Sequence, residues 1–250
     1  MRACDIRLER KQVICALTGS HNYNLDTPES DQDYKIFTFP SFDDIYYHDY
    51  YTVSNISADF DYTAHDIRRL PLFLRKSNLN FLEILFSQDL VFFHPYDQSL
   101  QHRLTVVRED IAAMNLVGMY DACYGTHIQK HSKMLRGTST TQQLVDAFGY
   151  DTKQAQHCYR NLDFLERYHA TDFKSFAQAI YYDDGPERDM MLAIKAGEYT
   201  LLEFEALLQE KQVKVRALQE NYMASYFVER TNTLVEDLIK EVVREHILIL

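Results

Sequence analysis

The sequence contains no tryptophan and only seven glycines, five prolines and four cysteines among its 250 residues. Tyrosine and phenylalanine therefore supply all of the aromatic side chains. The cysteines are widely scattered, at Cys4, Cys15, Cys123 and Cys158. This scatter excludes the close spacings of metal-binding and disulfide frameworks, and it predicts reduced thiols in a cytoplasmic protein.

Long apolar runs are also missing. No stretch is apolar over the roughly 18 residues that a membrane-spanning helix requires. The first residues, Met1-Arg2-Ala3-Cys4-Asp5, lack the apolar region of a secretory signal. We therefore expect no membrane partner and a cytoplasmic location.

Positive charge is scarce, because 26 Lys and Arg residues face 37 Asp and Glu residues, for a net charge of −11. A protein that grips long nucleic acid electrostatically is usually basic. An acidic chain must instead concentrate its positive charge locally or bind something small. Metal ions in a site would offset part of the carboxylate charge.

What is present is an apolar content of 46 %, which is enough for a sizeable core. Alternating and short apolar runs predict strands over 13–18, 31–38, 58–64 and 90–93, with helices over 67–76 and 79–86. Residues 5–12 are expected to form a short helix. From about residue 97 helical periodicity takes over, with helices over 98–135 (interrupted), 140–148, 151–168, 172–180, 187–195, 199–221 and 231–246.

This pattern predicts an α+β protein with two parts. Residues 1–96 should form a small mixed β-sheet with flanking helices, and residues 97–250 an all-helical domain that closes a cleft. The boundary is placed at the composition change near residues 95–100. No Gly/Ser-rich linker separates the halves, so we expect them to pack together.

One stretch near the N-terminus carries the clearest chemistry. The apolar run Val13–Leu17 ends at Gly19-Ser20, and Asp31 and Asp33 follow after a polar loop. If the second segment is a strand, both carboxylates face the same side of the sheet. Gly19 allows a phosphate to approach the backbone closely, and Ser20 adds a hydroxyl and an N–H. Two converging carboxylates beside this turn suggest a divalent metal held against a phosphate.

A two-metal site generally needs a third carboxylate from another segment. The strand predicted over 58–64 alternates strictly, with Asp59, Asp61 and Thr63 on one face. Asp61 is the preferred third ligand and Asp59 the reserve. An Asp-x-Asp pair standing alone is more often a solvated face, so the hypothesis depends on the ordered combination of all these segments.

The same segments resemble a known family. The pattern Gly19-Ser20, Ser30-Asp31-x-Asp33 is similar to the signature of the DNA polymerase beta-like nucleotidyltransferase superfamily. The fuller stretch from Gly19 to Lys35 resembles the predicted nucleotidyltransferases of the RNA repair pathway. Further matching segments lie over residues 61–70, 80–86 and 150–160. The sequence departs from the usual pattern at Asn22, Asn24 and Lys35, where Ala, Gly and Arg are typical, and these departures bear on substrate preference.

The resemblance implies a nucleotidyltransferase core that binds Mg²⁺, with two ions expected, through Asp31, Asp33 and Asp61. It implies that Gly19, Ser20, Ser30 and Lys35 bind the nucleotide. Lys153, His157 and Arg160 lie at i, i+4 and i+7, on one face of a helix. That face either contacts the triphosphate or the acceptor, as the family motif suggests, or is an ordinary solvated face.

These observations predict a Mg²⁺-dependent enzyme that transfers a nucleoside monophosphate from an NTP such as ATP to an acceptor hydroxyl, releasing pyrophosphate. Asp31, Asp33 and Asp61 are the expected catalytic residues. By resemblance the acceptor is an RNA 3′ end. The alternatives are a small molecule, a protein side chain, or a nucleotide-binding regulator without catalysis. The apolar stripe of the last helix, from Leu234 to Leu250, either packs into the body or forms a homo-oligomer contact.

Overall fold

The computed structural model describes residues 6–56, 60–93, 97–138 and 141–249. By their internal contacts the residues form two compact units. The first contains Met1–Asn115 and Phe227–Leu250, and the second contains Leu116–Tyr226. Each unit is described separately below.

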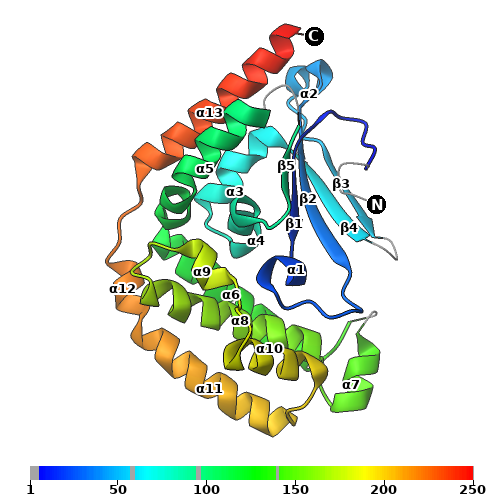
Figure 1. Cartoon of the computed structure of the whole chain (residues 1–250), viewed down its shortest axis with the longest axis vertical. Coiled ribbons are helices and arrows are strands. Elements are labelled where there is room, and N and C mark those ends of the chain that lie inside the picture. The colour runs from blue at the N-terminus through cyan, green and yellow to red at the C-terminus, as the bar shows by residue number, and fades with distance from the viewer. Residues whose placement is uncertain (1–5, 57–59, 94–96, 139–140, 250) are drawn as a thin grey trace. The chain divides into compact units, whose positions relative to one another are not determined.

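A five-stranded mixed sheet forms the centre of the first unit (Figure 1). Its order is β3-β4-β2-β1-β5. Strands β2 and β4 are parallel, whereas the other neighbours are antiparallel. The strands are β1 (Gln12–Thr18), β2 (Gln32–Thr38), β3 (Thr52–Ile56), β4 (Phe60–Asp66) and β5 (Leu90–Phe92). The expected α+β class and mixed sheet are confirmed, while the assignment to a nucleotidyltransferase core stays a prediction.

Short helical segments connect these strands. They are α1 (Ser20–Tyr23), α2 (Phe42–Tyr46), η2 (Ile67–Arg69), α3 (Leu70–Arg75), α4 (Leu79–Leu82) and η3 (Glu83–Phe86). Asp66 accepts a hydrogen bond from the Arg68 N–H and so caps η2, as a short polar side chain does at a helix start. Pro71 lies in the first turn of α3, where its missing N–H leaves no intrahelical bond unmade.

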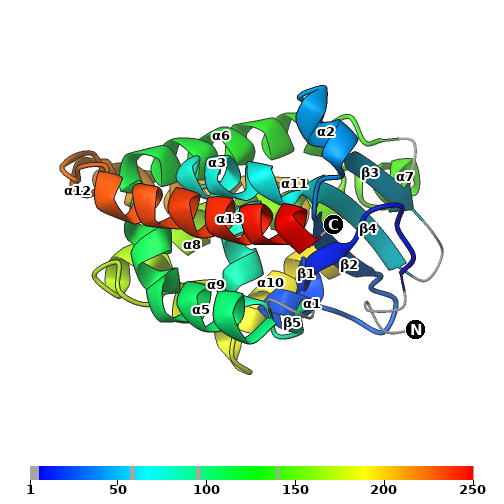
Figure 2. The ribbon, with the colours of Figure 1, turned by 90° about the horizontal axis from the view of Figure 1, so that it is seen from above.

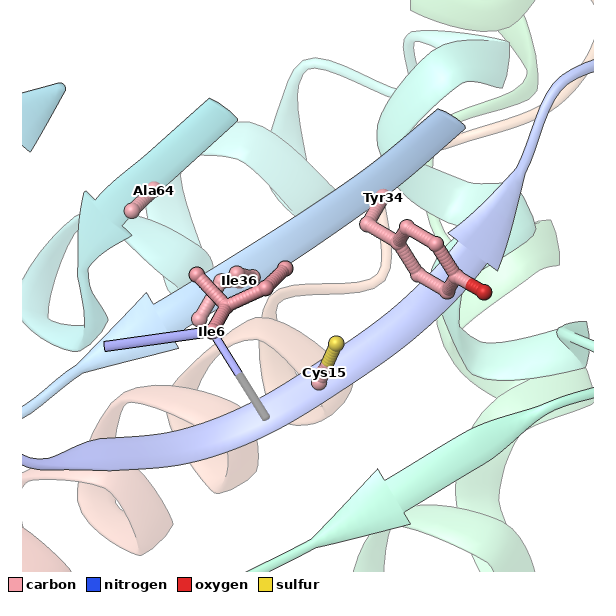
Figure 3. Packing of buried hydrophobic residues seen from close by; sticks show 5 residues of the cluster. All are labelled: Ile6, Cys15, Tyr34, Ile36 and Ala64. Atoms are coloured by element: carbon pink, nitrogen blue, oxygen red, sulfur yellow. The ribbon is translucent and has the colours of Figure 1, made fainter. Parts of the chain in front are cut away.

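Strand alternation divides the sheet into two faces. One face carries a cluster of Ile6, Cys15, Tyr34, Ile36 and Ala64, which Figure 3 shows gathered over β1, β2 and β4. The helix predicted over residues 5–12 is therefore wrong, because residues 6–11 are not helical and the chain places Ile6 against this cluster. On the opposite face, Phe37 of β2 and His65 of β4 contact the Phe73 ring of α3.

Two long helices complete the first unit, α5 (Asp97–Ala113) and α13 (Glu229–Ile249). Helix α13 packs against both α3 and α5, and Figure 2 shows it running between them. Val235, Leu238, Ile239 and Val242 are buried, so this side of the last helix packs into its own unit, whereas Leu234 and Leu248 of the predicted apolar stripe are exposed. The chain leaves this unit after Asn115 and returns at Phe227, and the Val228 N–H donates to the Met114 carbonyl at 2.8 Å. This division differs from the boundary at residue 96 drawn from composition.

Helices are the only regular secondary structure among the described residues of the second unit. Helix α8 (Thr152–Ala170) contacts five other helices of this unit. The helices are α6 (Leu116–Met134), α7 (Gln142–Phe148), α8, α9 (Phe176–Ile180), α10 (Pro186–Ala196), α11 (Leu201–Ala217) and α12 (Gln219–Met223). Twelve residues of α8 are buried, so it serves as the core of the unit. No helix among the described residues is long and apolar enough to cross a membrane.

Candidate active site on strands β2 and β4

Two of the predicted carboxylates lie side by side in the sheet. Asp33 of β2 is paired with Asp61 of β4 in the parallel register. Paired residues on neighbouring strands point to the same face, and the strands lie about 5 Å apart. Both residues are partly buried. The parallel pairing therefore brings together two acidic groups that are far apart in sequence.

The third predicted carboxylate is placed differently. Asp31 precedes β2 and is exposed, whereas Asp59 lies outside the described residues. Among the residues that the structure describes, no three His, Cys, Asp or Glu side chains are gathered closely enough to hold a metal ion. The three-carboxylate metal site thus stays a prediction. Of its three residues, the sheet places Asp33 and Asp61 side by side.

Gly19 follows β1 and lies against the Asp33 carboxylate. Its backbone angles are φ 73° and ψ −148°, a conformation that side chains disfavour. A Cβ atom at this position would come within 2.6 Å of Asp33 Oδ2. Thr18, the residue before it, donates its hydroxyl to the Asp33 carbonyl at 3.2 Å. Glycine is therefore needed here for two reasons, namely the backbone conformation and the space that Asp33 occupies.

A buried glutamate stabilises this turn through hydrogen bonds. Glu83, only 2 % exposed, accepts a hydrogen bond from the Gly19 N–H at 3.1 Å. The Asn22 side-chain amide lies 3.4 Å from the same Glu83 carboxylate oxygen, and Asn22 Oδ1 accepts the Gln88 N–H at 2.9 Å. Sequence reasoning missed this network. Its signals in the sequence were Asn22, where the resembled pattern has Ala, and Glu83, a charged residue within an otherwise apolar segment.

The other departure, Asn24, has a conformational explanation. Asn24 ends α1 with φ 60° and ψ 37°, in the left-handed region. Glycine adopts this region freely and asparagine tolerates it better than most residues do. Asn24 therefore suits the turn that joins Ser20 to the following loop.

The loop between Ser20 and β2 is organised around Ser30. Its hydroxyl accepts the Thr27 N–H at 2.9 Å, and its own N–H donates to the Thr27 carbonyl at 2.8 Å. The Ser30 carbonyl lies 3.3 Å from His21 Nε2. Ser30 thus has a structural role in the turn, and its predicted contact with a nucleotide stays a prediction, as does that of Ser20.

Lys35 and His65 continue the face that carries Asp33 and Asp61. The Lys35 ammonium lies 5.7 Å from the centre of the Phe81 ring. His65 is buried, with its ring 5.8 Å from that of Phe81. Burial, assisted by the positive charges of Lys35 and Arg69, lowers the pKa of His65 to about 4. His65 is therefore neutral near pH 7, and Lys35 is the cation nearest to the aligned carboxylates along β2.

In the second unit the three basic residues predicted on one helix face do lie on one helix, α8. Lys153 is exposed, His157 is partly buried and Arg160 is 6 % exposed. The pKa of His157 is held well below its ordinary value by burial and by the charges of Arg160, Lys130, Lys153 and Lys195. Lys130 of α6 and Lys195 of α10 thus extend this basic cluster. Sequence reasoning missed their association, because three separate helices contribute to it.

The described cysteines are core residues. Cys15, Cys123 and Cys158 are buried, while Cys4 lies outside the described residues. Cys158 Sγ lies 3.1 Å from His127 Nδ1, but burial raises the pKa of the thiol and lowers the pKa of His127 to about 4. This pair is therefore a neutral hydrogen-bonded pair in the core rather than a nucleophile and its base.

Compared with protein-family models and with curated proteins, the chain matches none. The functional interpretation therefore depends on the motifs and on the geometry of the aligned carboxylates.

Proposed function

We propose that the chain is a Mg²⁺-dependent nucleotidyltransferase that moves a nucleoside monophosphate from an NTP to an acceptor hydroxyl, with an RNA 3′ end as the favoured acceptor. The observation that carries the proposal is the in-register pairing of Asp33 with Asp61 beside Gly19. Carboxylates at this position, next to a backbone turn without a side chain, suit a site that receives phosphate groups.

The residues present fit a magnesium ion. Magnesium is usually bound by one or two carboxylates together with water and substrate phosphate oxygens, rather than by a closed protein cage. Asp33 and Asp61 would supply the two carboxylates, and the exposed Asp31 would add a third. When bound, the ion would neutralise charge on the phosphates and polarise the phosphoryl group.

The chain's own residues have distinct roles in this proposal. Asp61 would accept the proton of the attacking hydroxyl as general base. Glu83 and Asn22 would keep the Gly19 turn in place, so that the Asp33 carboxylate stays beside the Gly19 backbone. Contacts of Lys153, His157 and Arg160 with the triphosphate stay a prediction of the motif.

The test incubates the purified chain with each of the four NTPs, labelled at the α-phosphate, with MgCl₂ and total RNA. A parallel sample contains RNA whose 3′ hydroxyls have been blocked. We expect label on intact RNA and none on blocked RNA, and loss of labelling when EDTA is added. Label on the protein itself or on a small molecule would redirect the proposal to those acceptors.

Variants test the site itself. Asp33→Asn and Asp61→Asn should each lower the rate of transfer by at least about a hundredfold, because each removes a charge that must face the phosphate or the proton. Asp43→Asn, at an exposed position of α2, is the matched control and should keep the wild-type rate. Full activity of Asp33→Asn would contradict the assignment. No transfer to any acceptor, together with no Mg²⁺-dependent NTP binding, would contradict the proposal. NTP binding without any transfer would favour the nucleotide-binding regulator without catalysis.

A further inference from the structure

A groove in the first unit lies apart from the aligned carboxylates. Strands β2 and β4 start near Asp33 and Asp61, whereas the groove is lined by η2 and α3, which follow the far end of β4, and by α13. Its volume is about 600 Å³. Pro71 and Leu72 line it from α3, and Ile239, Val243 and Ile247 line it from α13. The floor of the groove is therefore apolar.

The lining of α13 repeats with the period of a helix. Groove residues recur from Glu236 to Leu248, at spacings of three and four. A helix rises 1.5 Å per residue, so the groove follows α13 for about 18 Å, or roughly three turns. Leu72 is 45 % exposed and Leu248 is 80 % exposed, which shows that the groove is open to the surface along its length. An open apolar channel of this length matches the apolar face of one short helix.

Cations flank the apolar floor on both sides. Arg68 and Arg75 lie on the α3 side, and Lys240 and Arg244 lie on α13, against the single acidic residue Glu236. This local excess of positive charge occurs in a chain whose net charge is −11. The charge of Arg68 is matched by the buried Asp66 carboxylate, 2.6 Å from Arg68 Nη2, so the excess is supplied by Arg75, Lys240 and Arg244. The Arg75 guanidinium lies 5.2 Å from the Phe227 ring centre. The groove therefore combines an apolar floor with positively charged side chains along its edges.

We propose that this groove, lined by α3 and α13, binds an acidic amphipathic helix of a partner protein. Apolar side chains of that helix, spaced at i, i+3, i+4 and i+7, would fill the channel. Its flanking Glu and Asp residues would face Arg75, Lys240 and Arg244, and this complementarity would fix the orientation. A nucleic acid fits less well, because the floor offers apolar side chains to a polyanion. The proposal uses none of the residues of the proposed transferase site and is independent of it.

The probe is a fluorescein-labelled synthetic 16-residue peptide with leucines at helical spacing and glutamates on both flanks. One matched peptide carries lysines in place of the glutamates, and another has the same composition in scrambled order. Fluorescence anisotropy with the full-length chain should show saturable binding of the glutamate peptide. The lysine and scrambled peptides should bind at least about tenfold more weakly.

Variants of the chain locate the binding. The double reversal Lys240→Glu with Arg244→Glu should weaken binding of the glutamate peptide by at least about tenfold and strengthen binding of the lysine peptide. Leu72→Glu, on the other wall, should weaken it as well. Arg230→Glu, exposed on α13 outside the groove, is the matched control and should bind as the wild type does. Circular dichroism of each variant checks that the fold is kept, and the two walls provide independent tests.

Two results would overturn the proposal. One is equal binding of the three peptides, or absence of binding by the glutamate peptide. The other is a result in which dodecanoate, tested as a separate ligand, binds to the wild type but not to the groove variants, while the glutamate peptide does not bind. The groove would then be a site for an anionic amphiphile.

Discussion

At the scale of single residues, the absence of a side chain at position 19 decides where the Asp33 carboxylate lies. Asp33 Oδ2 occupies the space that a Cβ of residue 19 would enter, and the backbone there has a positive φ. The Gly19 N–H is meanwhile taken by Glu83. One glycine therefore links the end of β1, the start of β2 and the buried glutamate of η3.

Replacing this glycine should be costly. Gly19→Ala should lower the free energy of unfolding by about 1–3 kcal/mol, because it forces a side chain into a strained backbone region and against a carboxylate. Denaturant titration followed by circular dichroism measures the change. Gly125→Ala is the control, since it lies in α6 with nothing within 4 Å of the new Cβ. It should raise stability by about 0.5–1 kcal/mol, and a similar loss in both variants would contradict this explanation.

His65 gives a second prediction at this scale. Its pKa is about 4 in the folded chain, against about 6.5 when unfolded. Between these values the unfolded chain binds a proton that the folded chain does not, so this residue's stabilisation is lost as the pH falls from 6.5 towards 4. His65→Gln should therefore lose less stability than the wild type between pH 6.5 and 4.5, by about 2–3 kcal/mol.

Urea titrations of wild type and variant at the two pH values measure this difference. His102→Gln, at an exposed position of α5, serves as the control and should follow the wild-type pH dependence. Identical pH dependence of the His65 variant and the wild type would show that His65 is not kept neutral by its surroundings.

At the scale of elements, a buried ion pair joins α8 and α11 in the second unit. Lys211 Nζ lies 2.8 Å from Asp163 Oδ1 and also contacts Glu166. The Tyr182 hydroxyl donates to the other Asp163 oxygen at 2.6 Å. The carboxylates, led by Asp163, raise the pKa of Lys211 against the opposing effect of burial. The positive charge of Lys211 is therefore balanced by nearby carboxylates, and these contacts specify how α8 and α11 align.

Removing one partner leaves the other charge buried without compensation. Lys211→Met should lower the free energy of unfolding of this unit by about 3–5 kcal/mol, even though its apolar length is kept. Lys214→Met, exposed three residues further along the same helix, should change stability by no more than about 0.5 kcal/mol. Thermal and denaturant unfolding measure the stability of both variants. Equal stability of the two variants would contradict a stabilising role for the ion pair.

At the scale of the whole molecule, the second unit is a continuous segment inserted into the first. The flanking residues Met114 and Val228 are joined by a backbone hydrogen bond of 2.8 Å. A short Gly-Ser connection can therefore replace residues 116–226 without stretching the chain. We expect the shortened protein to keep its fold, because α5 and α13 remain to cover the apolar sides of α3 and of each other.

The comparison is with a fragment that ends at residue 96. That fragment lacks α5 and α13 and leaves their buried partners exposed, so it should not unfold cooperatively. Dispersed amide resonances and a sigmoidal denaturation curve for the shortened protein, and their absence for the fragment, are the expected results. The opposite result would favour the boundary drawn from composition.

The elements of this chain could largely be predicted from its sequence. Apolar runs and alternation predicted β1, β2, β4 and β5, because these patterns act over a few neighbouring residues. Strand β3 and helix α2 were missed. Most of β3 is exposed at the edge of the sheet, and α2 depends on a capping box at Ser41 and on Asp44, which binds Arg10. Arg10 is distant from Asp44 in sequence, so this contact leaves no local pattern, whereas the capping box itself is a local signal of a helix start.

The sequence by itself determined four of the five strands, the long helices, the acidic charge and the residue types of the candidate site, since each follows from local composition and spacing. Only the tertiary structure decided that Asp33 pairs with Asp61, that Glu83 holds the Gly19 turn, and that α13 belongs with the sheet. The parallel register and the return of the chain at Phe227 join segments that are far apart in sequence. Long-range pairings of this kind are selected by packing of the whole unit, which no local pattern encodes.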